Sequence, residues 1–141
     1  MAQPIIEVKN LKKYFNVPAG VNHAVDDVSF VIEKGKTLGV VGESGCGKST
    51  LGRTVLKLHE PTSGKIIYDG KDITRAKGKK LGQLRQEMQM IFQDPYSSLN
   101  PRMSVQELIA EPMIVAGLYK SKSLLYEKVD ELMDTLERLM R

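Results

Sequence analysis

The sequence predicts an α/β fold, and three observations support this prediction. The first 36 residues alternate apolar and polar side chains in the manner of strands. A short apolar run, Thr37–Val41, then leads into a glycine-rich octapeptide and a helical pattern from Lys48 to Leu58. Beyond residue 104, apolar side chains recur with helical spacing. We therefore expect a sheet followed by helices, with the glycine-rich loop between a buried strand and a helix.

Two strands are expected before the glycine-rich loop. Polar residues separate the apolar ones around Val8, and the alternation is regular around Phe30. After the first helix, Glu60–Gly64 predicts a turn and Lys65–Tyr68 a further strand. Asp69–Gly70 predicts a tight turn, and a short helix is expected around residues 81–87.

The glycine-rich octapeptide matches G-x-x-x-x-G-K-[ST] at every fixed position. In order, its residues are Gly42, Glu43, Ser44, Gly45, Cys46, Gly47, Lys48 and Ser49. Glycines let successive backbone N–H groups point at phosphate oxygens, and the following helix adds the positive end of its dipole. In this motif Lys48 can reach the β- and γ-phosphates, and the Ser49 hydroxyl can bind Mg²⁺. The octapeptide, together with Thr50, is therefore predicted to hold the phosphates of a nucleotide.

The last 40 residues predict two helices. Ser104 and Glu107 form a capping box, so a helix should begin at Val105, and Pro112 is expected to kink or end it. The second helix is expected from Ser123 to Arg141 and carries an apolar stripe: Leu125, Val129, Leu132, Met133, Leu136, Leu139 and Met140. Such a stripe must be covered, either by self-association or by packing on the preceding helix.

The composition of the chain excludes several classes of protein. A chain with 41% hydrophobic and 27% charged residues is globular rather than disordered. No run approaches the 18 apolar residues that a membrane-spanning helix needs. Part of the net charge of +4 lies in a cluster formed by Arg75, Lys77, Lys79 and Lys80. Because no aromatic residues are interleaved with these cations, a solvated loop is expected rather than a nucleic-acid or membrane surface.

Two further observations narrow the class of phosphate-loop protein. Several strands precede the octapeptide, whereas kinases and GTPases usually place this loop after their first strand. The guanine-reading N-K-x-D tetrapeptide is absent. About 40 residues beyond the octapeptide, residues 90–102 read MIFQDPYSSLNPR. With these two motifs the chain resembles the nucleotide-binding subunits of ATP-binding-cassette (ABC) transporters, and among them those of oligopeptide and dipeptide importers.

The resemblance runs from about Ile5 to at least Val115 and implies a fold. That fold is a phosphate-loop NTPase core with an N-terminal antiparallel β subdomain and the start of a helical subdomain, together forming an incomplete cassette. Residues 1–94 would form the N-terminal part of the ATP-binding core. Residues 95–141 would continue the loop around Gln93 and begin the helical subdomain.

The resemblance also assigns roles to residues outside the octapeptide. Tyr14 occupies the place of the aromatic residue that stacks on adenine, with Phe15 as the alternative. Gln93 resembles the family's Q-loop glutamine, a catalytic residue whose amide oxygen can contact Mg²⁺ and the attacking water. Asp94 could instead be the Mg²⁺-organising aspartate at the end of a strand, but the residues that follow favour the Q-loop, so Asp94 is expected to be non-catalytic.

The cofactors implied are ATP and Mg²⁺. The implied partners are a second nucleotide-binding subunit, identical or not, transmembrane permease subunits and, indirectly, a solute-binding protein. The subunit would lie peripherally on the cytoplasmic face of the cell membrane, and no nucleic acid is expected as a partner. The L-S-G-G-Q signature, the Asp-Glu strand end and the switch histidine are missing from the sequence. The isolated chain is therefore expected to bind nucleotide weakly, if at all, and not to turn it over.

Two other functions remain open at this point. The chain could be a non-catalytic assembly module that self-associates through its last helix. It could also be a cassette ATPase outside transport that acts on nucleic acid through the residue 75–80 cluster.

Overall fold

The computed structural model describes residues 3–94 and 98–141. The chain divides into two compact units, Met1–Gln89 and Met90–Arg141, each with its own core. The predicted boundary between residues 94 and 95 stays a prediction. Within the described ranges, no helix is both long enough and apolar enough to cross a bilayer.

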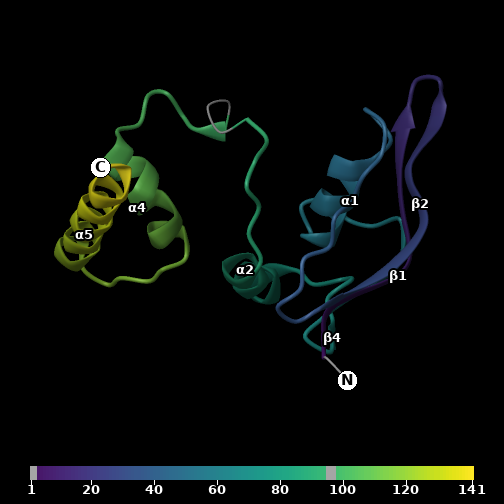
Figure 1. The fold of residues 1–141 in the computed structure, drawn as a ribbon, viewed down its shortest axis with the longest axis horizontal. Helices are drawn as coiled ribbons and strands as arrows, with labels where there is room; N and C mark the ends of the chain where they lie inside the picture. The colour runs from purple at the N-terminus through teal and green to yellow at the C-terminus, as the bar shows by residue number, and fades with distance from the viewer. Residues whose placement is uncertain (1–2, 95–97) are drawn as a thin grey trace. The chain divides into compact units, whose positions relative to one another are not determined.

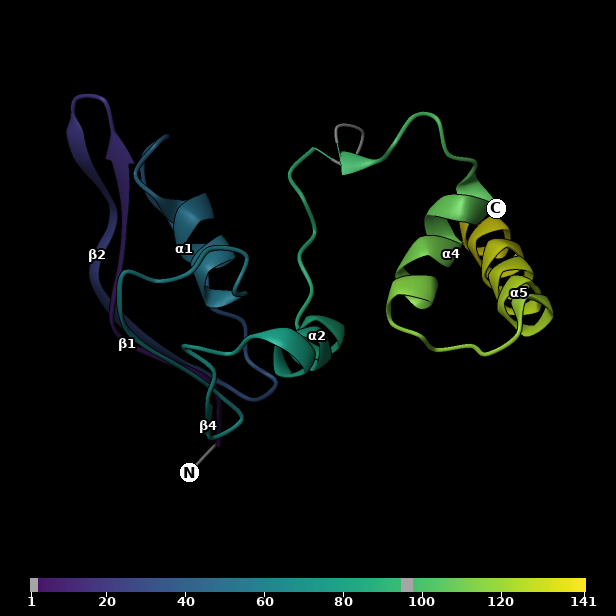
Figure 2. The ribbon, with the colours of Figure 1, turned by 180° about the vertical axis from the view of Figure 1, so that it is seen from behind.

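The first unit is organised by an antiparallel sheet in the order β2-β1-β3-β4. Strands β1 (Pro4–Val17) and β2 (Gly20–Glu33) form a long hairpin (Figures 1 and 2). Strand β3 (Ser63–Tyr68) pairs with the other edge of β1. Strand β4 (Lys71–Asp72) follows the Asp69–Gly70 turn, whose φ angles of 45° and 73° have the signs that a two-residue hairpin turn requires. The predicted strands and this turn are confirmed.

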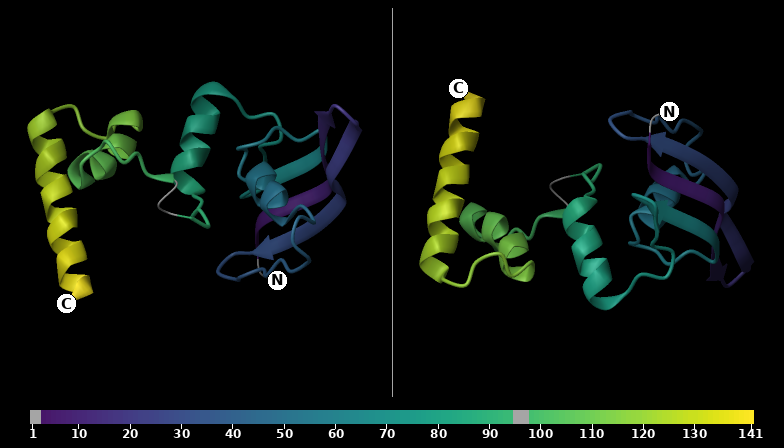
Figure 3. Two further views of the ribbon diagram at one scale, coloured as in Figure 1. Left: turned by 90° about the horizontal axis from the view of Figure 1, so that it is seen from above. Right: turned by 90° about the horizontal axis from the view of Figure 1, so that it is seen from below.

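Helix α1 (Lys48–Val55) packs on one face of the sheet, and α2 (Gly78–Glu87) contributes Leu84 to the same core. Figure 3 shows α1 lying against the sheet. Because β1 and β3 pair Val8 with Ile66, these two side chains point to the same face, where they meet the helices. The core that results is listed here in full: Val8, Leu11, Val55, Ile66, Ile73, Ala76 and Leu84.

The strand predicted at Thr37–Val41 is wrong. These residues have no regular secondary structure, and the Val41 side chain is 93% exposed. A buried strand needs hydrogen-bonding partners on both edges, and no strand of the described residues pairs with this segment. The apolar run Met88–Phe92 likewise forms no strand. Helix α1 also ends earlier than predicted, at Val55 rather than Leu58.

The second unit is a pair of helices, α4 (Val105–Val115) and α5 (Lys122–Met140), packed on one another (Figure 1). The capping box is confirmed: the Glu107 N–H donates to Ser104 Oγ at 3.2 Å, and the Ser104 N–H donates to Glu107 Oε2 at 2.7 Å. Pro112 lies inside α4 but does not end it.

Part of the predicted stripe on α5 is buried against α4. Ala110 of α4 meets Leu125 and Val129 of α5 in a small core. This confirms packing between the two predicted helices. Toward the end of α5 the stripe is uncovered, and Leu139 is 78% exposed.

Candidate nucleotide-binding site

The phosphate-loop octapeptide bends by means of left-handed glycines. Gly45 and Gly47 have φ angles of 79° and 95°, and the Cys46 N–H donates to the Glu43 carbonyl at 3.4 Å. Gly47 is the N-cap of α1, and no side chain caps this helix end. The first N–H groups of α1 therefore lack side-chain acceptors and can donate to an anion.

Close approach of the backbone explains why residue 47 is glycine. A Cβ atom added at Gly47 would lie 2.0 Å from the Ala24 carbonyl oxygen, and the φ angle of 95° is unfavourable for any L side chain. The contact with Ala24 sets the phosphate loop against β2. The loop and the β1–β2 hairpin therefore form one site.

Lys48 extends its ammonium group across the loop. Its Nζ donates to the carbonyl oxygens of Gly42 at 2.9 Å and Glu43 at 2.5 Å, and it lies 3.6 Å from Cys46 Sγ. These partners are exposed and carry no net charge, so phosphate oxygens would compete well for the same donors.

A pocket of about 350 Å³ joins the loop to the β1–β2 hairpin. Four hairpin residues and six loop or helix residues line it: Phe15, Asn22, His23, Ala24, Gly45, Cys46, Gly47, Lys48, Ser49 and Thr50. Ser49 is exposed and Thr50 half-buried, both in the first turn of α1. The structure thus brings most of the predicted phosphate-binding residues to one pocket.

Of the two aromatic candidates, Phe15 lines this pocket and Tyr14 does not. The Tyr14 ring stacks on His23, with ring centroids 3.9 Å apart and an interplanar angle of 15°. Its hydroxyl donates to Asp26 Oδ1 at 2.5 Å, and Lys12 Nζ lies 3.1 Å from the same oxygen. The Tyr14 hydrogen bond, followed by that of Lys12, holds the pKa of Asp26 below its usual value. Both the ring and the hydroxyl of Tyr14 thus already have partners within the hairpin.

Phe15 is available on the pocket side. Its ring makes an edge contact with His59 at 5.6 Å between centroids, and Lys13 Nζ lies 4.7 Å from its centroid. Sequence reasoning held Phe15 as the alternative to Tyr14. Adjacent residues of a strand face opposite ways, and register shifts on either side of Lys13 obscure which of the two faces the loop.

The role predicted for Gln93 stays a prediction. This residue lies in the second unit, exposed and outside regular secondary structure. Of the motif that follows it, residues 95–97 lie outside the described residues. No cluster of three metal-ligating side chains occurs in the described ranges, so a bound metal ion would need ligands other than such a cluster.

Comparison with known proteins identifies the family. The sequence profile described as ABC transporter matches residues 25–140, most of the chain. The chain belongs to the ABC transporter family. It is 49% identical over 137 residues to the oligopeptide transport ATP-binding protein OppF of Bacillus subtilis, covering 96% of this chain and 45% of that protein. It is 47% identical over 128 residues to the dipeptide transport ATP-binding protein DppF of Lactococcus lactis, covering 87% and 41%.

Solved structures confirm the cassette fold. The ATP-binding cassette MJ0796, in a dimeric post-hydrolysis state with ADP and Pi, matches with a TM-score of 0.74 at 23% identity, covering 94% of this chain and 57% of that one. CbiO1 of Clostridium perfringens matches with a TM-score of 0.67 at 27% identity, covering 93% and 49%. The chain spans somewhat less than half the length of the curated relatives it matches.

Proposed function

We propose that this chain is the phosphate-loop portion of the ATP-binding subunit of a peptide importer and that it binds Mg-ATP. The observation that carries the proposal is the pocket in which the uncapped first turn of α1, Lys48 and the left-handed glycines meet the β1–β2 hairpin. The names of the relatives in oligopeptide and dipeptide transport support the class of solute.

The residues present suit a triphosphate. Backbone N–H groups of the loop and of the first turn of α1 would donate to the phosphate oxygens. Lys48 would exchange the carbonyls of Gly42 and Glu43 for the β- and γ-phosphates. The Ser49 hydroxyl would hold Mg²⁺, with Thr50 beside it in the same helical turn. When bound, Mg²⁺ supplies positive charge that offsets the charge of the phosphates.

For the base, we assign adenine stacking to Phe15. Its ring lines the pocket, whereas the ring of Tyr14 is already covered by His23 and its hydroxyl is held by Asp26. A flat hydrophobic ring gains most by covering the flat face of a base. The Phe15→Ala variant is therefore expected to lose more ATP affinity than Tyr14→Ala.

The remaining roles follow from family membership. Gln93 would contact Mg²⁺ and the attacking water, and when ATP binding closes a dimer of such subunits its loop would carry that motion to permease subunits in the membrane. A second nucleotide-binding subunit would complete the site, and a solute-binding protein would deliver the peptide. The subunit would then lie on the cytoplasmic face of the membrane.

Tested alone, the 141-residue chain is expected to bind ATP without hydrolysing it. Its sequence holds no signature segment and no strand ending in Asp-Glu, so the attacking water and the transition-state charge lack these organising groups.

Isothermal titration of the purified chain with Mg-ATP tests the proposal. The Lys48→Ala variant should bind at least about tenfold more weakly, because a charge-assisted contact to phosphate is lost. The control variant Lys34→Ala removes an exposed lysine that does not line the pocket and should bind like the wild type. Equal affinity of wild type and Lys48→Ala, with both folded, would contradict the proposed site.

Exposed apolar residues support one other function, that of a self-associating module. Val41 and Ile91 are more than nine-tenths exposed, and Met140 near the end of α5 is 87% exposed. Surfaces of this kind favour association. Light scattering over a range of concentrations would separate the two functions: a mass that rises with concentration and ignores Mg-ATP favours the module.

A further inference from the structure

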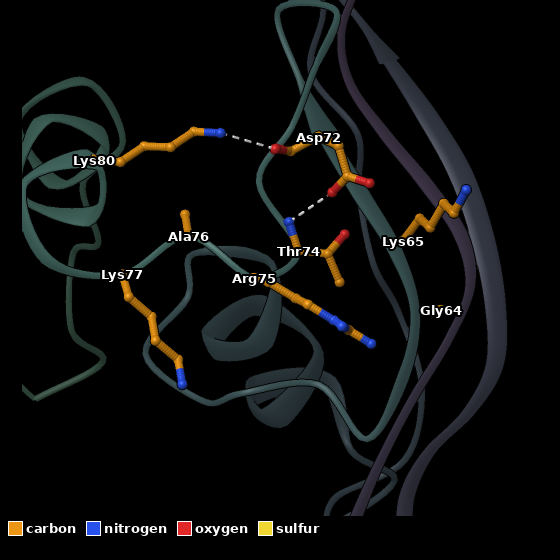
Figure 4. Close-up of a pocket in the computed structure, with 8 residues that line it drawn as sticks. All are labelled: Gly64, Lys65, Asp72, Thr74, Arg75, Ala76, Lys77 and Lys80. Carbon is orange, nitrogen blue, oxygen red and sulfur yellow. Dashed lines mark hydrogen bonds between the residues drawn. The ribbon is translucent and has the colours of Figure 1, made fainter.

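The first unit holds a second pocket, which the nucleotide site does not use. It encloses about 510 Å³ at the β3–β4 end of the sheet, and it shares no lining residue with the phosphate-loop pocket. Four of its eight lining residues are cations and one is a carboxylate (Figure 4): Lys65, Arg75, Lys77 and Lys80, with Asp72.

The positive charge of this pocket is not neutralised by ion pairs. Among the described residues, none of the four cations takes part in an ion pair. Lys80 donates to the backbone carbonyl of Asp72 at 3.1 Å, which leaves its charge in place. The Asp72 carboxylate itself accepts from the Thr74 N–H at 2.8 Å.

The backbone that carries Arg75 is held in place on both sides. Lys57, whose side chain is fully buried, donates to the Thr74 carbonyl at 2.6 Å and to Glu60 at 2.7 Å. The Thr74 hydroxyl accepts from the Ile66 N–H at 2.9 Å, and the buried Ala76 donates its N–H to Ile73 at 3.0 Å. The backbone of Arg75 is therefore preorganised, and binding of a ligand would cost little backbone conformational entropy.

Helix α2 adds to the positive field. Its N-cap, Lys77, makes no side-chain capping bond, and its first turn holds no acidic residue. Lysines at the positive end of a helix dipole are unfavourable unless an anion lies nearby. The pocket thus combines four cations around a single carboxylate, Asp72, with a helix start that lacks acidic residues in its first turn.

We propose that this pocket binds a phosphate group, carried either by a small polyphosphate or by the headgroup of an anionic phospholipid, with Arg75 and Lys77 as its main ligands. These two residues also line an adjoining pocket of about 360 Å³. In Figure 4 the Arg75 side chain extends toward the strand that carries Gly64 and Lys65. Its guanidinium can offer two parallel N–H donors to phosphate oxygens. No aromatic residue lines either pocket, which disfavours nucleic acid because bases would have no ring to stack on.

Titration with pyrophosphate tests the free-phosphate source. The Lys48→Ala chain serves as the parent, so that the phosphate loop does not contribute and failure of the nucleotide site leaves this test intact. Adding Arg75→Gln should weaken pyrophosphate binding about tenfold, because a bidentate charge-assisted contact is lost. Adding Lys79→Gln removes one charge from the first turn of α2 without touching the pocket lining, and should change affinity by less than about threefold.

Co-sedimentation with vesicles tests the lipid source in the same variants. Mixed phosphatidylglycerol–phosphatidylcholine vesicles should retain the parent and Lys79→Gln chains but release Arg75→Gln, and pure phosphatidylcholine should retain none. If Arg75→Gln weakens binding of only pyrophosphate or only the vesicles, that result identifies whether the phosphate group comes from a small polyphosphate or from a lipid. Equal losses from Arg75→Gln and Lys79→Gln with both probes would show diffuse charge and overturn the site. Failure of both probes to bind, or binding of duplex DNA alone, would also overturn it.

Discussion

The β1–β3 pair and the Thr37–Val41 segment of the first unit both carry apolar residues in a pattern that predicts strands, but their structural outcomes are opposite. Val8 and Ile66 are almost completely buried where β1 and β3 pair, whereas Val41 is 93% exposed in a segment without a strand. The β1–β2 hairpin closes through a short turn and pairs with β3, but the Thr37–Val41 segment finds no partner among the described strands. An apolar pattern thus specifies a strand only where a partner strand is at hand to pair with it.

The phosphate loop lies at the border between these two kinds of region. On its C-terminal side it is fixed by α1 and by the contact of Gly47 with Ala24, and on its N-terminal side it follows the unpaired segment. Lys48, Ser49 and the first N–H groups of α1, which are proposed to bind phosphate and Mg²⁺, belong to the fixed side. The account therefore predicts a working phosphate site even though the preceding strand is not formed.

The largest expected difference between the two stretches is the loss of stability when one side chain in each is truncated. Ile66→Ala should lower the free energy of unfolding by about 2–5 kcal/mol, because it opens a cavity in the core. Val41→Ala should change it by less than about 0.5 kcal/mol, because the Val41 side chain meets mostly solvent. Urea denaturation followed by circular dichroism measures both. A cost at Val41 similar to that at Ile66 would mean that the segment is buried in solution.

The next largest effect is expected at the fixed side of the loop. Gly47→Ala should cost about 2 kcal/mol or more and abolish nucleotide binding, because alanine is strained at φ 95° and its Cβ would strike the Ala24 carbonyl. Gly52→Ala is the matched control: it lies inside α1 with open space around it, and should stabilise the chain by up to about 1 kcal/mol. Denaturation and Mg-ATP titration of both variants would check this. Normal Mg-ATP binding by Gly47→Ala would show that the phosphate loop does not require glycine at position 47.

Features with local causes were predictable from the sequence. The phosphate-loop motif, the Asp69–Gly70 turn and the Ser104 capping box depend on residues close together in the chain, and the structure contains the turn and the capping box as predicted. Features that depend on distant partners were not predictable. The unpaired Thr37–Val41 segment needed knowledge of its neighbours, and the preference for Phe15 over Tyr14 in the pocket depended on register shifts within β1.

In the second unit, the N-termini of α4 and α5 can be compared in the same way. Ser104→Ala should lower the stability of that unit by about 1 kcal/mol, because the Glu107 N–H loses its acceptor. Ser121 stands at the N-cap of α5 but makes no side-chain capping bond, so Ser121→Ala should cost less. Amide exchange rates within each helix report the difference, and equal costs would contradict the assigned caps.

The smallest expected effect concerns pH. The Ser104 backbone and side-chain hydrogen bonds lower the pKa of Glu107. The ionised Glu107 therefore adds stability at pH values above the pKa it has when unfolded, and this contribution disappears as the pH falls through the lower, folded pKa. The stability of α4 should thus fall on acidification, and Glu107→Gln should flatten that part of the profile. An identical dependence of stability on pH in Glu107→Gln would show that the Glu107 carboxylate does not stabilise α4.

Amide hydrogen exchange with and without Mg-ATP tests the central claim most directly, because it reads each segment separately. The account predicts fast exchange across Thr37–Val41 in the free chain, and slower exchange from Gly42 through the first turn of α1 once Mg-ATP is added. It also predicts that Lys48→Ala abolishes this slowing. Unchanged exchange of the octapeptide at saturating Mg-ATP, in a chain whose β1–β3 amides are well protected, would contradict the claim that this unit holds a working phosphate site.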